Sequence, residues 1–202
     1  MTSGWPATLR ALSAAGTVTV RPLRRRDARA WSAVRARNGA WLEPWEATSP
    51  TGAPAASFGA YVAAARAHAR AGTHLPVVSE LDGRLVGQVT VASIVRGSAC
   101  TASIGYWIDS AVAGRGIVPT AVALVIDHCF AEVGLHRIEI AIRPENAPSL
   151  RVVTKLGLRE EGVRERFLHI DGRWRDHRVF AVTSEEVPGG LLARLRARAE
   201  SA

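Results

Sequence analysis

The segment from Gly105 to Gly157 constrains the fold more than any other part of this chain. It begins with the run Gly105–Asp109, typical of a buried strand, and a turn containing Gly114 and Gly116 then opens a helix. Such a helix start presents free backbone N–H groups and the positive end of the helix dipole. We therefore predict a phosphate site at this turn, although ordinary strand–helix turns also use glycine.

A second polar helix start follows about forty residues later in the same segment. Asn146 and Ser149 stand three residues apart, next to Pro148, after an alternating strand pattern over residues 137–143. Asn and Ser are common capping residues, so this spacing alone fits either a helix cap or a ligand site.

The hydrophobic pattern predicts an α/β fold of mixed α+β type, in which helices cover both faces of a central twisted mixed sheet of about seven strands. Strands are expected at 17–21, 74–81, 84–95, 101–109, 137–143, 159–170 and 173–183, and helices at about 28–38, 57–71, 118–133 and 148–156. We expect Asp27 and Ser57 to cap the first two helices, and residues 41–54 to form a loop.

One domain over residues 17–187 accommodates all of these elements. Residues 1–16 are rich in Ala, Gly and Ser, and we expect a flexible, loosely attached extension. Residues 188–202 are expected to form a basic tail that is able to be helical.

The net charge of +8 comes from 25 Arg and a single Lys, Lys155. This excess would attract a polyphosphate ligand or RNA close to a protein substrate, but solubility explains it as well. Cys100 and Cys129 have no metal-binding spacing, so no metal is expected, and Cys129 is expected to be a buried thiol. Without a membrane-spanning run or a secretion signal, we expect a cytoplasmic protein that binds no membrane.

Several motifs together resemble the GNAT N-acetyltransferases, and in particular the ribosomal-protein-alanine (RimJ/RimL) branch. They are Val20-Arg-Pro-Leu-Arg, Pro44-Trp-Glu46, His136-Arg-Ile-Glu, Arg143-Pro-Glu-Asn-x-x-Ser and the final Asp-Gly-x-Trp-x-Asp hairpin. The family's pyrophosphate signature, Gln/Arg-x-x-Gly-x-Gly/Ala, falls on residues 113–118. Gly116 matches its central glycine, whereas Ala113 and Val118 depart from its ends.

The resemblance implies acetyl-CoA as the cofactor, held largely by backbone N–H groups. The residues that it implies for cofactor binding are Trp107, Ile108, Asp109, Gly114, Arg115, Gly116, Ile117, Val118, Thr120, Asn146, Ser149 and Lys155. A backbone N–H near 107–109 would stabilise the thioester oxyanion.

The catalytic pair is implied less directly. Related N-terminal acetyltransferases place a Glu and a Tyr where this chain has Ala141 and Val153. Glu139 on the same strand face is therefore the candidate base, and Ser149 the candidate proton donor to the leaving thiolate. Glu139 could equally pair with Arg137 or Arg143.

The resemblance implies acetyl transfer to the N-terminal α-amine of a protein, plausibly ribosomal, by direct attack in a ternary complex. Trp41, Trp45 and Glu46 are the candidate substrate-binding residues, and Glu46 is a second candidate base. Two alternatives stay open: a small-molecule amine as acceptor, or a non-catalytic acyl-CoA-binding assembly factor. We expect a monomer or dimer with no sequence-specific nucleic acid binding.

Overall fold

The computed structural model describes residues 7–52 and 56–200. A single mixed sheet has the strand order β1-β2-β3-β4-β5-β6-β8-β7. Its strands are β1 (Leu9–Ser13), β2 (Gly16–Pro22), β3 (Leu75–Leu81), β4 (Arg84–Val95), β5 (Thr101–Ile108), β6 (Arg137–Ile142), β7 (Arg159–Ile170) and β8 (Arg173–Thr183). The helices are α1 (Ala28–Arg37), α2 (Gly39–Leu42), α3 (Phe58–Ala71), α4 (Ile117–Ala131), α5 (Ala147–Leu156) and α6 (Leu191–Glu200).

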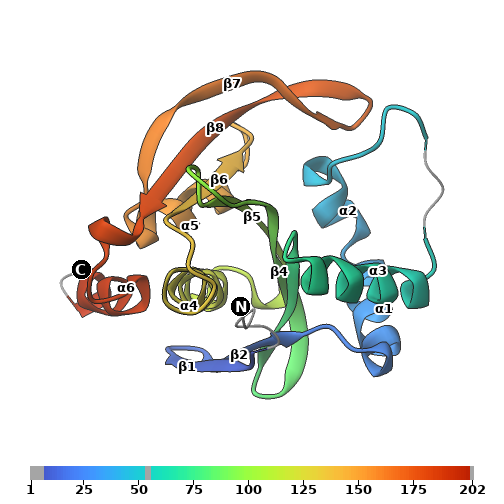
Figure 1. The fold of residues 1–202 in the computed structure, drawn as a ribbon. Coiled ribbons are helices and arrows are strands. Elements are labelled where there is room, and N and C mark those ends of the chain that lie inside the picture. The colour runs from blue at the N-terminus through green and yellow to red at the C-terminus, as the bar shows by residue number, and fades with distance from the viewer. Residues whose placement is uncertain (1–6, 53–55, 201–202) are drawn as a thin grey trace.

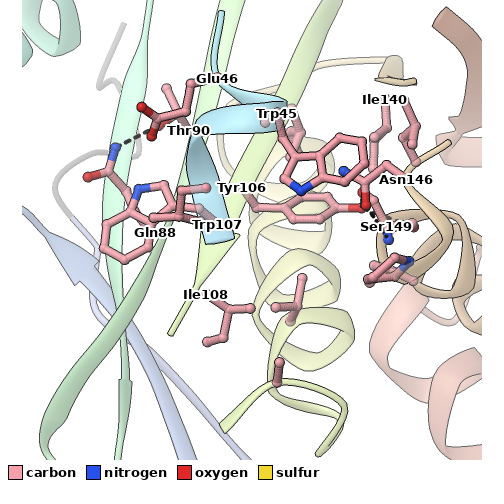
Figure 2. A pocket seen from close by; sticks show the side chains of 18 of the residues that line it. Trp45, Glu46, Gln88, Thr90, Tyr106, Trp107, Ile108, Ile140, Asn146 and Ser149 are labelled. Carbon is pink, nitrogen blue, oxygen red and sulfur yellow. Dashed lines mark hydrogen bonds between the residues drawn. The ribbon is translucent and has the colours of Figure 1, made fainter. Parts of the chain in front are cut away.

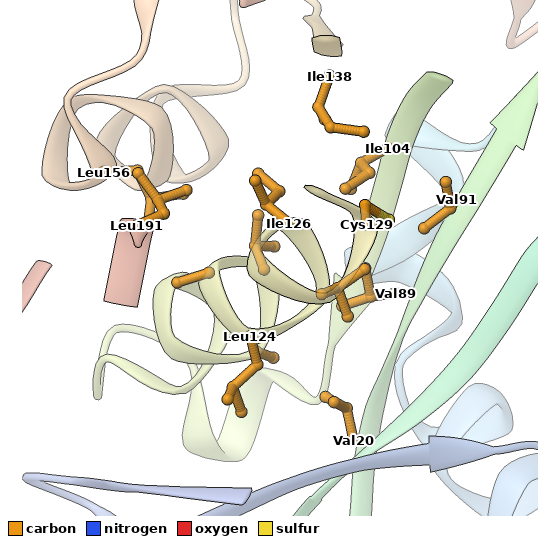
Figure 3. Packing of buried hydrophobic residues seen from close by; sticks show 14 of the residues in the cluster. Val20, Val89, Val91, Ile104, Leu124, Ile126, Cys129, Ile138, Leu156 and Leu191 are labelled. Atoms are coloured by element: carbon orange, nitrogen blue, oxygen red, sulfur yellow. The ribbon is translucent and has the colours of Figure 1, made fainter. Parts of the chain in front are cut away.

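Helices cover both faces of this sheet, as predicted (Figure 1). On one face, α4 packs in the larger core against Val20, Val89 and Ile138 (Figure 3). On the other face, α1 and α3 enclose a smaller core around Val34 and Val62. Helix α4 is apolar around most of its circumference because the sheet, α5 and α6 surround it.

The prediction of about seven strands misses β1, and the prediction of a loose extension over residues 1–16 is wrong for Leu9–Ser13. These residues pair antiparallel with β2, and Ala11 is buried in the larger core. The Ser13 hydroxyl donates to the Gly16 carbonyl at 2.9 Å and closes the short connection. Residues 1–6 of that segment lie outside the described residues.

The tail over residues 188–202 contains the helix α6. Leu191 is fully buried, and its N–H donates to Asp127 of α4 at 2.6 Å. Arg194 donates to the Gly157 carbonyl at the end of α5. The basic segment therefore packs on the domain through its first turn.

Two local predictions need correction. Residues 41–54 were expected to be a loop, but the end of α2 and a 3-10 turn at Glu43–Trp45 occupy part of them. Residues 53–55 lie outside the described residues. The Asp27 carboxylate does not cap α1 but accepts hydrogen bonds from Arg21 and from the Arg24 N–H. The Ser57 cap is confirmed, since its hydroxyl accepts from the Ala60 N–H at 3.3 Å.

The pairing of β5 with β6 sets the position of the site. These parallel strands pair only from Thr101–Ser103 to Arg137–Glu139 and then diverge. Beyond that point β5 stays paired with β4, while β6 stays paired with β8. A gap therefore opens between the carboxyl ends of β5 and β6, a common place for ligands in α/β sheets.

A buried polar cluster fixes α1 to the end of β5. The Asp109 carboxylate accepts from Arg37 and, at 2.8 Å, from the Asn38 amide, and these bonds hold the pKa of Asp109 below its ordinary value. The Asn38 carbonyl oxygen accepts from the Ser110 N–H at 2.9 Å and from its hydroxyl at 2.7 Å. Because Asn38 is 1% exposed, water cannot replace these bonds.

We predict that Asn38→Ala lowers the free energy of unfolding by about 2–3 kcal/mol, because it leaves Asp109 and Ser110 with fewer buried partners. Urea titration followed by circular dichroism measures this loss. Thr154→Ala is the control: it removes one exposed intrahelical bond and should change stability by no more than about 0.5 kcal/mol. A loss below 1 kcal/mol for Asn38→Ala would contradict the anchoring role.

Candidate active site

A cavity of about 830 Å³ lies where β5 and β6 diverge, and both faces of the sheet contribute to its lining (Figure 2). Tyr106 and Ile108 face the larger core, whereas Gln88, Thr90 and Trp107 project to the side of α1 and α3. The cavity therefore has two arms that meet at the gap between the strands. One arm reaches α4 and α5, and the other reaches α1, α2 and α3.

The start of α4 forms one wall of the first arm. Gly114 and Gly116 line the cavity with φ values of +80° and +82°, and a Cβ at either would enter open space. Gly116 is the N-cap, and no side chain caps it. Since Pro119 lacks an N–H and the Thr120 N–H bonds to the Gly116 carbonyl, the free donors are on the residues before them.

Most of the predicted cofactor residues line the cavity, and three do not. Those in the lining are Trp107, Ile108, Gly114, Gly116, Ile117, Val118, Asn146, Ser149 and Lys155. Asp109 is instead turned toward α1, and the Thr120 hydroxyl donates to the Gly116 carbonyl at 2.9 Å. Arg115 is exposed outside the lining. Spacing alone could not separate these three from their neighbours.

The backbone of β5 offers a donor at the gap. The Asp109 N–H donates to the Val86 carbonyl at 2.7 Å, so its backbone faces β4. Backbone groups alternate along a paired strand, so the N–H of Ile108 faces the opposite way, toward the gap. This geometry narrows the predicted oxyanion donor from residues 107–109 to Ile108.

At the start of α5, two hydroxyl groups meet inside the cavity. The Asn146 side chain caps the helix by accepting from the Ser149 N–H at 3.1 Å. The Ser149 hydroxyl lies 2.7 Å from the hydroxyl of Tyr106 (Figure 2). Burial raises the pKa of Tyr106 well above its ordinary value, so this phenol stays protonated. Tyr106 was not predicted as a site residue, because only the fold brings it to Ser149.

The predicted substrate residues Trp41, Trp45 and Glu46 all line the second arm. Glu46 forms an ion pair with Arg35. The Arg35 guanidinium also lies 5.5 Å from the ring centre of Trp31 and 5.4 Å from that of Trp107. The charge of Glu46 is therefore neutralised at the cavity wall.

A buried amide orders the polar groups of this arm. Gln88 is 5% exposed, and its Oε1 accepts from the Trp31 indole N–H at 3.0 Å. Because an indole N–H only donates, the Gln88 amide has one orientation. Its Nε2 then donates to the Tyr61 hydroxyl at 2.7 Å. It also donates to the Thr90 hydroxyl at 3.0 Å (Figure 2).

The orientation of the Gln88 amide makes the hydroxyl groups of Tyr61 and Thr90 hydrogen-bond donors toward the cavity. Each accepts from Gln88 and keeps its own proton, and neither proton has a partner among the described residues. The neighbour of Thr90 on β5 is Gly105, where a Cβ would meet nothing within 4 Å. Tyr61 and Thr90 therefore present two O–H donors to an open part of the cavity.

Glu139 is not among the residues that line the cavity. It lies opposite Ser103, in the last register pair before β5 and β6 diverge. Its carboxylate accepts from Arg137 at 2.9 Å and from Arg164 at 2.7 Å. The structure therefore favours the ion-pair alternative over a role as base.

Among the described residues, no group of three or more His, Cys, Asp or Glu could hold a metal ion. Burial raises the pKa of the Cys129 thiol to about 12, as expected for a buried, unreactive cysteine. Within the same residues no helix is long and apolar enough to cross a membrane.

Comparison with known proteins gives a consistent result. Residues 17–159 match the family model described as the acetyltransferase (GNAT) domain. The structure of Mycobacterium smegmatis RimJ, solved with CoA-disulfide, is similar, with a TM-score of 0.92 and 45% identity over 98% of this chain and 97% of that chain.

Two curated relatives match over shorter stretches. "Probable N-acetyltransferase YjcK" of Bacillus subtilis is 42% identical over 56% of this chain and 62% of its own length. The [ribosomal protein uS5]-alanine N-acetyltransferase of Escherichia coli is 31% identical over 54% of this chain and 56% of its own length. The chain thus matches about three fifths of the length of these relatives. The family model spans most of the described domain, and the chain belongs to the GNAT acetyltransferase family.

Proposed function

We propose that this protein transfers an acetyl group from acetyl-CoA to the N-terminal α-amine of a protein, by direct attack of the amine. A ribosomal protein is the proposed acceptor, because the similar Escherichia coli protein is named as a [ribosomal protein uS5]-alanine N-acetyltransferase. A cytoplasmic location belongs to the same proposal. The observation that carries it is the pair of hydroxyl donors, Tyr61 and Thr90, in the second arm of the cavity.

The first arm fits a pyrophosphate-containing cofactor. The uncapped start of α4 offers N–H donors to an anion, and the two glycines leave room for close approach. Lys155 lines the same arm and adds a positive charge. When bound there, acetyl-CoA would supply the activated acetyl thioester, and the Ile108 N–H would stabilise the negative charge that develops on its oxygen.

Ser149 is the proposed proton donor to the thiolate that leaves. Its hydroxyl lies in the cavity beside Tyr106, and when Tyr106 donates to it, the Ser149 proton is free to donate in turn. The cap of α5 uses the Ser149 backbone N–H rather than this hydroxyl. The two roles of Ser149 can therefore be separated by mutation.

An α-amine suits a site without a free carboxylate. Its pKa of about 7.7–8.0 leaves a substantial neutral fraction near pH 7, whereas a lysine amine, at about 10.4, is almost fully protonated. An α-amine therefore needs only modest help from a base to reach the neutral form that attacks the thioester.

The second arm favours a peptide over a polyamine. In an amino-terminal residue the carbonyl group is attached to the same α-carbon as the amine, and its oxygen accepts hydrogen bonds from O–H donors. A polyamine offers donors only, and it would favour a free carboxylate. Glu46 cannot serve as that carboxylate without breaking its ion pair with Arg35.

Gly116→Asp should weaken coenzyme A binding at least tenfold, because it places bulk and negative charge at the α4 start. Isothermal titration with coenzyme A measures this. Gly134→Asp is a matched control at the other end of the same helix, since Gly134 also has a positive φ of +69° and open space. Equal affinities for the two variants would move the pyrophosphate site elsewhere.

Ser149→Ala should lower kcat about tenfold or more and leave KM for acetyl-CoA nearly unchanged, because it removes a proton donor and keeps the helix cap. Steady-state kinetics with an Ala-starting peptide provide the measurement. Tyr106→Phe should give a smaller loss of kcat. An unchanged kcat in Ser149→Ala would show that Ser149 only supports the helix.

The double substitution Tyr61→Phe with Thr90→Val should lower kcat/KM for an N-terminal peptide by about tenfold, on the scale of one or two lost hydrogen bonds. The control acceptor is the same peptide with its first carbonyl reduced to a methylene group. For that compound the two enzymes should differ little. Equal losses for both acceptors would mean that the hydroxyl groups do not contact the carbonyl.

Mass spectrometry of purified protein with acetyl-CoA separates the alternatives. We expect a mass gain of one acetyl group on Ala- or Ser-starting peptides. Turnover of polyamines, antibiotics or free amino acids without any peptide product would support the small-amine alternative. Coenzyme A binding without turnover of any amine would support a non-catalytic acyl-CoA-binding protein.

A further inference from the structure

One titratable side chain in the cavity has no part in the mechanism above. His177 lies on β8, lines the cavity and is 3% exposed. Phe180 and Val182 of β8 pack in the larger core, and successive side chains of a strand point to opposite faces. His177 therefore projects to the opposite face, which carries the second arm. It stands one register step beyond the pair of Ile142 with Arg178, at the end of β6.

The tautomer of this histidine follows from its hydrogen bond. Its Nδ1 lies 2.9 Å from the Arg175 carbonyl oxygen, which only accepts, so Nδ1 carries the proton. The neutral ring then has its lone pair on Nε2. Among the described residues Nε2 has no hydrogen-bond partner.

The surroundings of His177 keep the ring neutral. Burial lowers its pKa below the ordinary value of 6.5, and the charge of Arg143 at the end of β6 acts in the same direction. The Arg175 carbonyl, Asp176 and Glu145 oppose this shift without reversing it. The ring of Phe167 on β7 packs edge-on against the imidazole, 5.7 Å between ring centres. The imidazole is therefore ready to accept a proton near neutral pH.

The other candidate bases of the site are already engaged. Glu46 pairs with Arg35, and Glu139 lies outside the cavity between Arg137 and Arg164. The Tyr61 hydroxyl already accepts from Gln88. Among the described lining residues, His177 thus combines a neutral form with an unpartnered acceptor atom.

We propose that His177 Nε2 is the general base for the attacking amine, which it reaches directly or through one water molecule. This assignment rests on the proposed acetyl transfer. Nε2 takes one proton from the amine, whose nitrogen forms a bond to the acetyl carbonyl carbon as the carbon–sulfur bond breaks. Ser149 gives its hydroxyl proton to the departing sulfur. The cycle closes when His177 releases its proton to water and Ser149 takes one proton back from water, so the protein returns to its starting state.

The variant His177→Asn separates catalysis from structure. The asparagine amide can keep the hydrogen bond to the Arg175 carbonyl, but it has no basic nitrogen. We expect kcat to fall about 10²- to 10⁴-fold, as for loss of a general base. His136→Asn is the matched control, since His136 is exposed and pairs with Glu185 outside the cavity. It should retain kcat within about twofold.

Imidazole rescue gives a readout that a structural role would not affect. His177→Ala leaves a hole of the size of the ring, and added imidazole should restore a measurable part of kcat, in proportion to its neutral fraction. In the wild type, kcat should fall as the pH drops through the lowered pKa of His177, that is, below pH 6.5. In His177→Asn the part of this fall that comes from His177 should be absent, leaving only the fall caused by protonation of the acceptor amine.

These measurements use whichever amine the wild-type protein acetylates, so they do not depend on a peptide acceptor. If only small amines are acetylated, the proposed acceptor is wrong while the base can still be assigned. A kcat for His177→Asn within threefold of wild type, or an unchanged acidic limb, would overturn the assignment. Absence of turnover with every amine would overturn both proposals.

Discussion

The site depends on the loss of backbone pairing between two parallel strands. β5 and β6 share three register pairs and then separate, because each is held by its other neighbour, β4 or β8. Side chains do not refill the gap: on the face of the second arm, Gly105 and Ala141 have almost no bulk. The gap joins the two sides of the sheet, so a cofactor at α4 and an acceptor near α1 can meet at Ile108.

The two arms are held in place by different interactions. The first arm rests on the larger core, in which α4 is surrounded by the sheet, α5 and α6. Among the described residues, the smaller core beneath the second arm contains five buried apolar residues, and partly buried aromatic rings pack against them. There a polar cluster of Arg37, Asn38, Asp109 and Ser110 fixes α1 to the end of β5. Directional bonds thus supplement this smaller core in fixing the position of α1.

The sequence predicted features that depend on local pattern. Alternation and helical spacing located α4 and the later strands, and the glycine turn located the uncapped helix start at Gly116. Features that depend on tertiary pairing were missed or misplaced. Spacing placed Glu139 on the same strand face as Ala141, but it could not show that β6 is still paired with β5 at that residue. Asp109 bonds to Asn38, which is 71 residues away in the sequence. Tyr106 contacts Ser149, 43 residues away, so no local pattern predicts either contact.

Hydrogen-bond polarity then supports the proposed recognition of an amino terminus in the second arm. An indole N–H fixes the Gln88 amide, which leaves O–H donors at Tyr61 and Thr90. A carbonyl oxygen fixes the His177 ring and leaves a lone pair at Nε2. An amino-terminal residue has the complementary groups, an amine that gives up a proton and a carbonyl oxygen that accepts hydrogen bonds. A simple alkylamine has only the first, so the proposed discrimination follows from the directions of two donor–acceptor chains: the Trp31 indole sets one, and the Arg175 carbonyl sets the other.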